Sequence, residues 1–216
     1  MKFKNAINMR KANYDKFPST KLTGMLVQGW DSIISMLKKK MDARKVLAVD
    51  LYTGVYEEEV LDAFSKEFSG RVMNVRDLMK PEKEIQALTE RFMTEDVLFG
   101  YVTNLKLEDY LDVDKVAAAR KQISEAKDAI VIIGTGASVV APQDAVVVYA
   151  DMARWEIQQR FRRHEVKALG IDNRKDAVSL QYKRGYFNDW RVCDLSLILI
   201  SEPTRPISIS YAVFCL

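Results

Sequence analysis

Two uninterrupted apolar segments limit the folds that this chain can adopt. Asp128–Gly134 and Asp144–Ala150 each run through at least five consecutive apolar residues without the alternation of a half-exposed strand. Strands of this kind are buried on both faces, which is typical of parallel sheets covered by helices on each side. Lys45–Leu51 is predicted to be a short buried strand, and Arg71–Val75 another strand. The sequence therefore predicts an α/β fold, with a mostly parallel sheet and helices on both faces.

Helical periodicity appears between these strands. Apolar residues recur at helical spacing from Gly29 onward, at Trp30, Ile33, Ile34, Leu37 and Met41. They form one face of a helix that ends in three lysines, where positive charge suits the helix dipole.

Further helices are expected in the remainder of the chain. Glu57–Phe68 has acidic residues in its first turn, and Leu78–Ser124 is mostly helical, with Pro81 opening one helix and Val113–Ile123 forming the best-defined one. Asp151 is expected to cap a helix that runs to about Lys167.

The turn after the first strand occupies the position of a phosphate-binding loop. Such a loop needs several glycines, a lysine and a Ser or Thr to hold phosphate and magnesium. The segment Asp50–Glu57 offers Gly54 alone, no lysine, and glutamates at 57, 58 and 59. Those carboxylates would satisfy the helix N-terminus themselves and repel a phosphate, which favours an ordinary β–α turn.

A second candidate loop directly follows the strongest strand. Gly134, Thr135, Gly136 and Ser138 supply two glycines and two hydroxyls where open α/β sheets place their ligands. We expect these four residues to contact a ligand. The alternative is a tight loop whose glycines solve a backbone problem.

The helix after the last long strand carries a group of basic side chains. Arg154 and Arg160 are the candidates for contact with a phosphate, and Arg162, Arg163 and His164 lie nearby. A bound anion is expected between these arginines and Gly134–Ser138. A solvated basic face explains the arginines equally well, because Glu156 and Glu165 are close enough in sequence to pair with them. His164, the sole histidine, is expected on the surface rather than in catalysis.

Composition excludes several functional classes. The net charge of +3 comes without a basic stripe, which argues against a nucleic-acid binder. No secretory signal or membrane span is recognisable. A single histidine and one cysteine outside the tail, Cys193, cannot build a histidine- or thiolate-rich zinc site. The unpaired thiol suits a reducing cytoplasm. No catalytic residue, metal ligand or cofactor is predicted for this chain.

The last residues resemble a translated sequencing adapter rather than a protein. Ile209–Leu216 is what ATC TCG TAT GCC GTC TTC TGC TTG encodes, similar to the flow-cell end of a short-read library adapter. Leu195–Arg205 resembles the transposon-end oligonucleotide of the same kit, with Leu199 as the departure. We therefore expect a lead-in segment over residues 1–28, a domain over 29–194, and a non-native tail over 195–216 that follows a truncated reading frame.

The domain also resembles a known family. Lys45–Leu51 with its eroded loop, Asp128–Gly134, and Asp144–Ala150 leading into Asp151–Arg163 resemble a uridine-kinase-like P-loop domain. Together with the ending Gly185–Asp194, they resemble the N-terminal region of long class I mannose-6-phosphate isomerases. The resemblance implies a cupin isomerase domain after Asp194 as the partner, in the same chain. It also implies that zinc belongs to that missing domain, and no position here matches its ligands.

Two functions remain open from the sequence. In the first, the chain is a non-catalytic kinase-like module that binds a nucleotide or sugar phosphate, or that only packs against the isomerase domain. In the second, it is an active phosphotransferase for a nucleoside or sugar, with an atypical phosphate loop. Loss of the loop glycines and lysine together removes the phosphate cradle, which favours the first.

Overall fold

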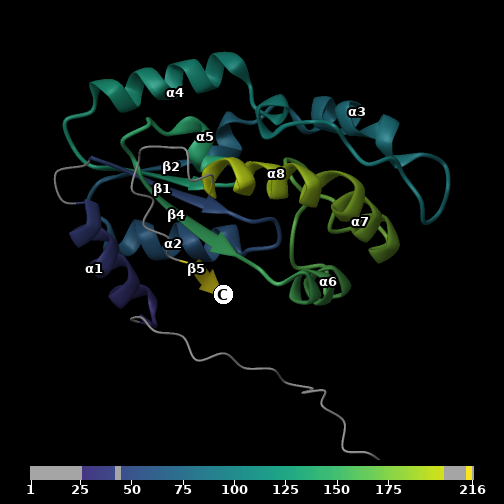
Figure 1. The fold of residues 1–216 in the computed structure, drawn as a ribbon, viewed down its shortest axis with the longest axis horizontal. Coiled ribbons are helices and arrows are strands. Elements are labelled where there is room, and N and C mark those ends of the chain that lie inside the picture. The colour runs from purple at the N-terminus through teal and green to yellow at the C-terminus, as the bar shows by residue number, and fades with distance from the viewer. Residues whose placement is uncertain (1–25, 42–44, 202–212, 216) are drawn as a thin grey trace, which may run out of the picture.

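A parallel sheet forms the centre of the domain in the computed structural model, which describes residues 26–41, 45–201 and 213–215 (Figure 1). Within these residues the strand order is β2-β3-β1-β4-β5, and every strand pair is parallel. The strands are β1 Val46–Leu51, β2 Arg71–Asn74, β3 Ile130–Gly134, β4 Val146–Asp151 and β5 Val213–Cys215. The first four confirm the strands predicted from the apolar segments.

Strand β1 lies at the centre of the sheet, between β3 and β4. Val49 pairs with Ile133 of β3 on one side and with Val148 of β4 on the other. All residues of β1 and β3 are buried, including the single charged one, Asp50. Burial on both faces accounts for the uninterrupted apolar pattern of these strands.

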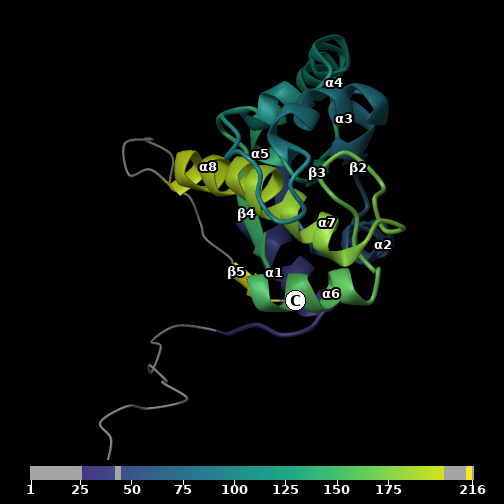
Figure 2. The same ribbon diagram turned by 90° about the vertical axis from the view of Figure 1, so that its right-hand side faces the viewer.

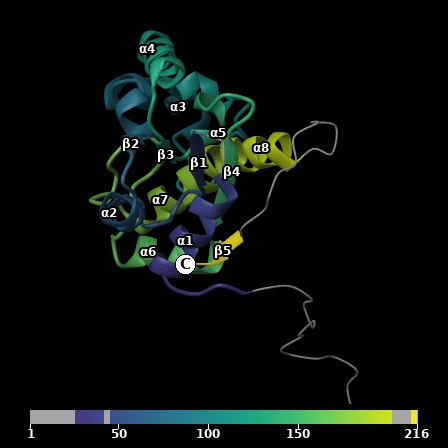
Figure 3. The same cartoon turned by 90° about the vertical axis from the view of Figure 1, so that its left-hand side faces the viewer.

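Helices cover both faces of the sheet, as the fold prediction requires. Helices α1 (Trp30–Met41) and α2 (Glu57–Glu67) lie on one face, while α4 (Val113–Glu125), α5 (Ala137–Val140) and α8 (Trp190–Ser201) lie on the other (Figures 1 and 3). In α1 the expected apolar face is the buried one, since Ile33, Ile34, Leu37 and Met41 all face the core. The α/β fold class is confirmed.

The segment between β2 and β3 makes a peripheral unit. It contains the 3₁₀ turn η1 (Val75–Leu78), helix α3 (Glu82–Met93) and the 3₁₀ turn η2 (Leu107–Tyr110). Pro81 directly precedes α3 at its N-cap, which confirms the predicted helix start. Helix α4 then begins at Val113, after Asp112 at the N-cap, whose carboxylate accepts hydrogen bonds from the amides of residues 114 and 115.

The helix after β4 is shorter than expected, and Asp151 does not cap it. Asp151 is the last residue of β4, and α6 spans Arg154–Arg162 after Ala153 at the N-cap. The prediction of a helix from Asp151 to about Lys167 was wrong at both ends. Asp151 stays extended because it pairs with β5, and His164 has a φ of 57°, which is incompatible with continuing the helix.

The chain then continues through α7 (Val178–Arg184), the π-helix η3 (Gly185–Asp189) and α8. Helices α6 and α7 lie beyond the carboxyl ends of the strands and face the viewer in Figure 2. Both candidate loops follow strands at these carboxyl ends, so α6 and α7 lie on the same side of the sheet as the loops.

The segments at either end of the chain are described in part. Of the lead-in segment, residues 1–25 lie outside the described residues. Helix α8 continues past Asp194 to Ser201, and Val213–Cys215 pairs with β4 at residues 149–151. The adapter origin of residues 195–216 stays a prediction. None of the helices in the described part of the chain has the length and apolarity needed to cross a bilayer.

Candidate functional site

The two loops predicted from the sequence meet at one edge of the sheet. Asp50, near the end of β1, pairs in register with Gly134, the last residue of β3. The loops that follow parallel strands all lie at the carboxyl ends of the strands, where open α/β sheets form their ligand-binding crevices. Thr53 and Gly54 of the first loop line the same cavity as Thr135 of the second. The two loops therefore border one cavity at the carboxyl ends of the strands.

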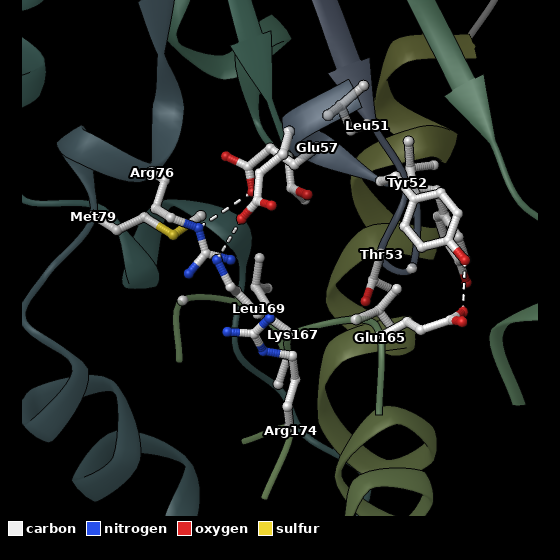
Figure 4. Close-up of a pocket in the computed structure, with 18 residues that line it drawn as sticks. Leu51, Tyr52, Thr53, Glu57, Arg76, Met79, Glu165, Lys167, Leu169 and Arg174 are labelled. Carbon is white, nitrogen blue, oxygen red and sulfur yellow. Dashed lines mark hydrogen bonds and ion pairs between the residues drawn. The ribbon is translucent and has the colours of Figure 1, made fainter. Parts of the chain in front are cut away.

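The cavity at this edge has a volume of about 90 Å³ and is drawn in Figure 4. Ligand pockets of drug-sized molecules are typically several times larger, roughly 300–1,000 Å³. Its walls come from four segments: the end of β1 with the start of α2, the η1 turn with Met79, the loop after β3, and the chain after α6. The lining residues are Leu51, Tyr52, Thr53, Gly54, Val55, Tyr56, Glu57, Glu58, Arg76, Met79, Thr135, Glu165, Val166, Lys167, Ala168, Leu169, Gly170 and Arg174.

The first loop, residues 52–56, is a tight turn held from outside the cavity. The amide of Val55 donates to the carbonyl of Tyr52 at 3.2 Å, and Gly54 has a φ of +90°. A Cβ at Gly54 would lie 2.8 Å from Cγ1 of Ile157, so glycine is needed for both conformation and space. The carbonyl of Gly54 accepts a hydrogen bond of 2.7 Å from Arg160.

The three glutamates that follow this loop bind side chains rather than the helix end. Glu57 pairs with Arg76 at 3.2 Å, and Glu58 pairs with Lys167 at 2.8 Å. Glu59 instead accepts from the indole of Trp30. Tyr56 makes no side-chain cap to α2. In place of the expected contact with the helix N-terminus, two of these carboxylates pair with cations and the third accepts from an indole, all on distant segments.

The second loop is closed by a carboxylate of the protein itself. The buried side chain of Asp50 accepts hydrogen bonds from the amide of Gly136 at 3.0 Å and from both the amide and the hydroxyl of Ser138. Burial raises the pKa of Asp50, and these three hydrogen bonds oppose the rise. Gly136 and Ser138, two of the residues expected to contact a ligand here, thus donate to an internal acceptor.

Asp50 was not among the residues predicted from the sequence, although a signal for it exists. It is the one charged residue within the buried strand β1, and buried charges are rare unless they are paired or hydrogen-bonded. A lone aspartate at this position therefore indicates donors on the adjacent loop. Its partners, Gly136 and Ser138, are residues that we had expected to contact a ligand.

The two candidate arginines of α6 also have partners within the protein. Arg160 is 5% exposed; besides Gly54 it contacts Glu156 at 3.2 Å and lies 3.7 Å from the ring centre of Tyr56. Arg154 pairs with Asp194, which also accepts from the hydroxyl of Tyr52. Neither arginine lines the cavity, so the structure brings only Thr135 of the six predicted ligand contacts to its wall.

The remaining basic residues of this region also have partners within the protein, and Arg162 donates to the side-chain oxygen of Gln159. Arg163 contacts both Glu156 and Glu165, the pairing partners named from the sequence. The Nδ1 atom of His164 lies 2.7 Å from the carbonyl oxygen of Arg174. These contacts are those of a solvated, ion-paired helix face. Among the described residues no group of three or more His, Cys, Asp or Glu side chains is arranged to hold a metal ion.

A buried ion pair supports the wall of the cavity formed by residues 168–170. The carboxylate of Asp189 lies 3.5 Å from Nε of Arg184, and both side chains are almost fully buried. Asp189 also accepts from the amide of Leu169, and Arg184 donates to the carbonyl of the same residue. Burial raises the pKa of Asp189, whereas the charge of Arg184 lowers it. Sequence analysis missed this pair, because nothing local marks either residue as buried.

The fold and site together define a class of protein: a doubly wound α/β domain whose central strand leads through a tight loop into a helix, as in P-loop proteins, but without the glycines and lysine of a phosphate loop. The family profile described as "Domain of unknown function (DUF8485)" matches residues 29–196. The chain belongs to this family.

Other comparisons yield distant similarities. A search of curated proteins finds no match. One similar solved structure is a gluconokinase from Sinorhizobium meliloti 1021, with 11% identity over 78% of this chain and 81% of that chain, at a TM-score of 0.41. Another is an uncharacterized protein from Eubacterium ventriosum ATCC 27560, with 14% identity over 79% of this chain and 88% of that chain, at a TM-score of 0.42.

Proposed function

We propose that this domain is a non-catalytic kinase-like module, which retains the strand–loop–helix unit of a P-loop protein but does not transfer phosphoryl groups. One observation carries the proposal: the carboxylates of Glu57 and Glu58 line the cavity at the place where a P-loop holds phosphates. Both belong to the first turn of α2, and each has its own cation. Carboxylates of the protein itself therefore occupy the place at which this loop would hold a phosphate.

Phosphoryl transfer depends on positive groups and free amides around the β- and γ-phosphates. The residues of this loop provide no lysine, and its one glycine turns its carbonyl toward Arg160. Removing a single preorganised donor from a catalytic site commonly costs a factor of about 10² to 10³ in rate. Loss of the whole cradle, with carboxylates in its place, is incompatible with useful turnover.

ATP titration by calorimetry in the presence of magnesium tests this proposal directly. We expect no binding at millimolar ATP and no phosphoryl transfer to a panel of nucleosides and sugars. The double variant Glu57→Gln/Glu58→Gln serves as the comparison, because it removes both negative charges and keeps side-chain size. Transfer by the unmodified chain above the background of heat-treated protein would support the active phosphotransferase instead.

The parent protein and natural ligand are finer parts of the same proposal. From the resemblance to two-part mannose-6-phosphate isomerases, we propose a role in carbohydrate metabolism, with a sugar phosphate or a nucleotide other than ATP as ligand and a zinc-binding cupin domain as partner. A cytoplasmic location is proposed because Cys193 is buried and unpaired. The uninterrupted gene downstream of the Asp194 codon provides the test. A cupin with clustered histidines and glutamates directly there would support both the parent and the adapter origin of the tail. A continuation through Leu195–Leu216 would refute the adapter origin, and a gene without a downstream cupin would refute the parent.

A further inference from the structure

Three basic side chains converge on the cavity from separate parts of the chain. Arg76 comes from η1, and Lys167 and Arg174 come from the segment between α6 and α7. Figure 4 shows the three side chains directed toward one another beside Glu57. Their side chains are 30%, 27% and 40% exposed, respectively, so each is accessible while anchored in the wall. Clustered cations of this kind repel one another unless an anion lies among them.

The anion now among them is the carboxylate of Glu58. It contacts Lys167 at 2.8 Å, and the charges of Arg174 and Arg76 reach it as well. The hydrogen bond and charge of Lys167 hold the pKa of Glu58 below its usual range. Yet the side chain of Glu58 is 80% exposed, far more than the 24% of Glu57. The side chain of Glu58 is thus far more exposed than the basic side chains around it, so an external anion can replace it.

The charge of the cluster indicates which external group fits in its place. Arg76 keeps Glu57 as its partner, and Arg174 keeps Asp172, which it contacts at 2.6 Å. With Glu58 turned out to solvent, three cations and these two carboxylates leave a single positive charge. A group with one negative charge restores neutrality, whereas a phosphate dianion would leave an excess of negative charge beside Glu57.

We propose that this cavity binds the carboxylate group of a small organic acid, which displaces the side chain of Glu58 from Lys167 and lies near Arg76 and Arg174. The proposal rests on the proposed function, because it requires that no phosphate of ATP binds at this loop. The cavity of about 90 Å³ limits the bound part to a short acid. Arg76 binds Glu57 through Nε, and Arg174 binds Asp172 through Nε and one Nη atom. A guanidinium has five N–H donors, so both arginines retain donors for a further carboxylate.

Displacement of Glu58 is energetically accessible. An exposed ion pair contributes at most about 1 kcal/mol, because water screens it and both side chains must be ordered. Removing this internal competitor should therefore tighten binding of an external acid by up to about fivefold, since about 1.4 kcal/mol corresponds to a factor of ten. Glu58→Gln, at an exposed position, is expected to fold like the unmodified chain.

The experiment is a titration of the full chain with sodium propionate, followed by amide NMR shifts at constant ionic strength. We expect binding that tightens severalfold in Glu58→Gln and weakens at least tenfold in Lys167→Met and in Arg174→Gln. Glu59→Gln is the matched control, because Glu59 lies in the same helical turn but bonds to Trp30 outside the cavity. That variant should bind propionate like the unmodified chain.

Two parallel titrations, with inorganic phosphate and with ATP and magnesium, identify the ligand class. Phosphate binding more tightly than propionate would overturn the preference for a carboxylate. No propionate binding in either the unmodified chain or Glu58→Gln, or an equal gain in Glu59→Gln, would overturn the site itself. Either result leaves the proposed function intact, which fails instead if ATP binds and transfers its phosphate.

Discussion

The loops after β1 and after β3 start side by side and yet are stabilised in opposite ways. The loop after β3, residues 134–138, has two glycines and two hydroxyls, but a buried carboxylate from β1 accepts its hydrogen bonds. The loop after β1 looks poorer in sequence, but it is held from behind by Arg160 and borders the cavity. The comparison teaches that a glycine-rich loop is a ligand site only if its donors are free.

The largest expected effect is on the loop after β3, through Asp50. Asp50→Asn replaces one acceptor oxygen with a donor that faces N–H and O–H groups, so the free energy of unfolding should fall by about 3 kcal/mol or more. Urea denaturation measures the change. Asp62→Asn, at an exposed position of α2, should stay within about 0.5 kcal/mol. A loss below about 1 kcal/mol at Asp50 would mean that the loop does not depend on this carboxylate.

The loop after β1 should depend comparably on Arg160. Arg160→Met leaves the Gly54 carbonyl without its donor and removes a buried charge from Glu156, at an expected cost of about 2–3 kcal/mol in unfolding free energy. Arg154→Met is the matched control on the same helix. Its side chain is 46% exposed, and its loss should cost less than about 1 kcal/mol. Equal costs for both variants would contradict a special role for Arg160 in holding the loop.

Gly54 tests how tightly the loop after β1 packs against α6. Gly54→Ala places a methyl group against Ile157 at a φ of +90°, and we expect a loss of about 2 kcal/mol in thermal or urea unfolding. Gly29→Ala provides the control for backbone strain alone, since Gly29 has a φ of +83° and nothing within 4 Å of an added Cβ. It should cost about 1 kcal/mol. If the two variants cost the same, the close approach to Ile157 is unimportant.

The smallest expected effect is on the pH dependence of stability, through the ion pair between Asp172 and Arg174 in the segment after α6. Hydrogen bonds from Arg174 lower the pKa of Asp172 to about 2. Because the folded pKa lies below the unfolded value of about 3.9, this pair adds stability above about pH 4 that is lost as the pH falls toward 2. The side chain of Asp172 is 39% exposed, so screening keeps the contribution well below 1 kcal/mol.

NMR titration of the Asp172 carboxyl carbon measures this pKa, and Arg174→Gln should return the midpoint toward its ordinary value. A midpoint near pH 4 in the unmodified chain would show that the pair does not form. It would also remove one of the two fixed carboxylates from the charge count of the cavity.

Much of the fold could be predicted from the sequence, but little of the cavity. The strands β1, β3 and β4 follow from local apolar runs, and helices α1 and α4 follow from local periodicity. The cap at Asp151 was predicted wrongly because a nearby strand partner, rather than local preference, decides its conformation. Of the charged residues that line the cavity, Arg76, Lys167 and Arg174 were not predicted, since their proximity depends on segments far apart in the chain.

The sequence by itself determined that the chain forms a buried parallel sheet and that its first strand leads into a loop without the residues of a phosphate site. These are local properties, because the spacing of apolar residues and the lack of a lysine in the loop after the first strand can both be read directly along the chain. The tertiary structure alone decided which polar groups have partners within the protein. Asp50 accepts hydrogen bonds from the loop after β3, Arg160 donates to the loop after β1, and Glu58 pairs with Lys167. Hydrogen bonds and ion pairs act over a few ångströms in space, so their partners are set by packing rather than by sequence order.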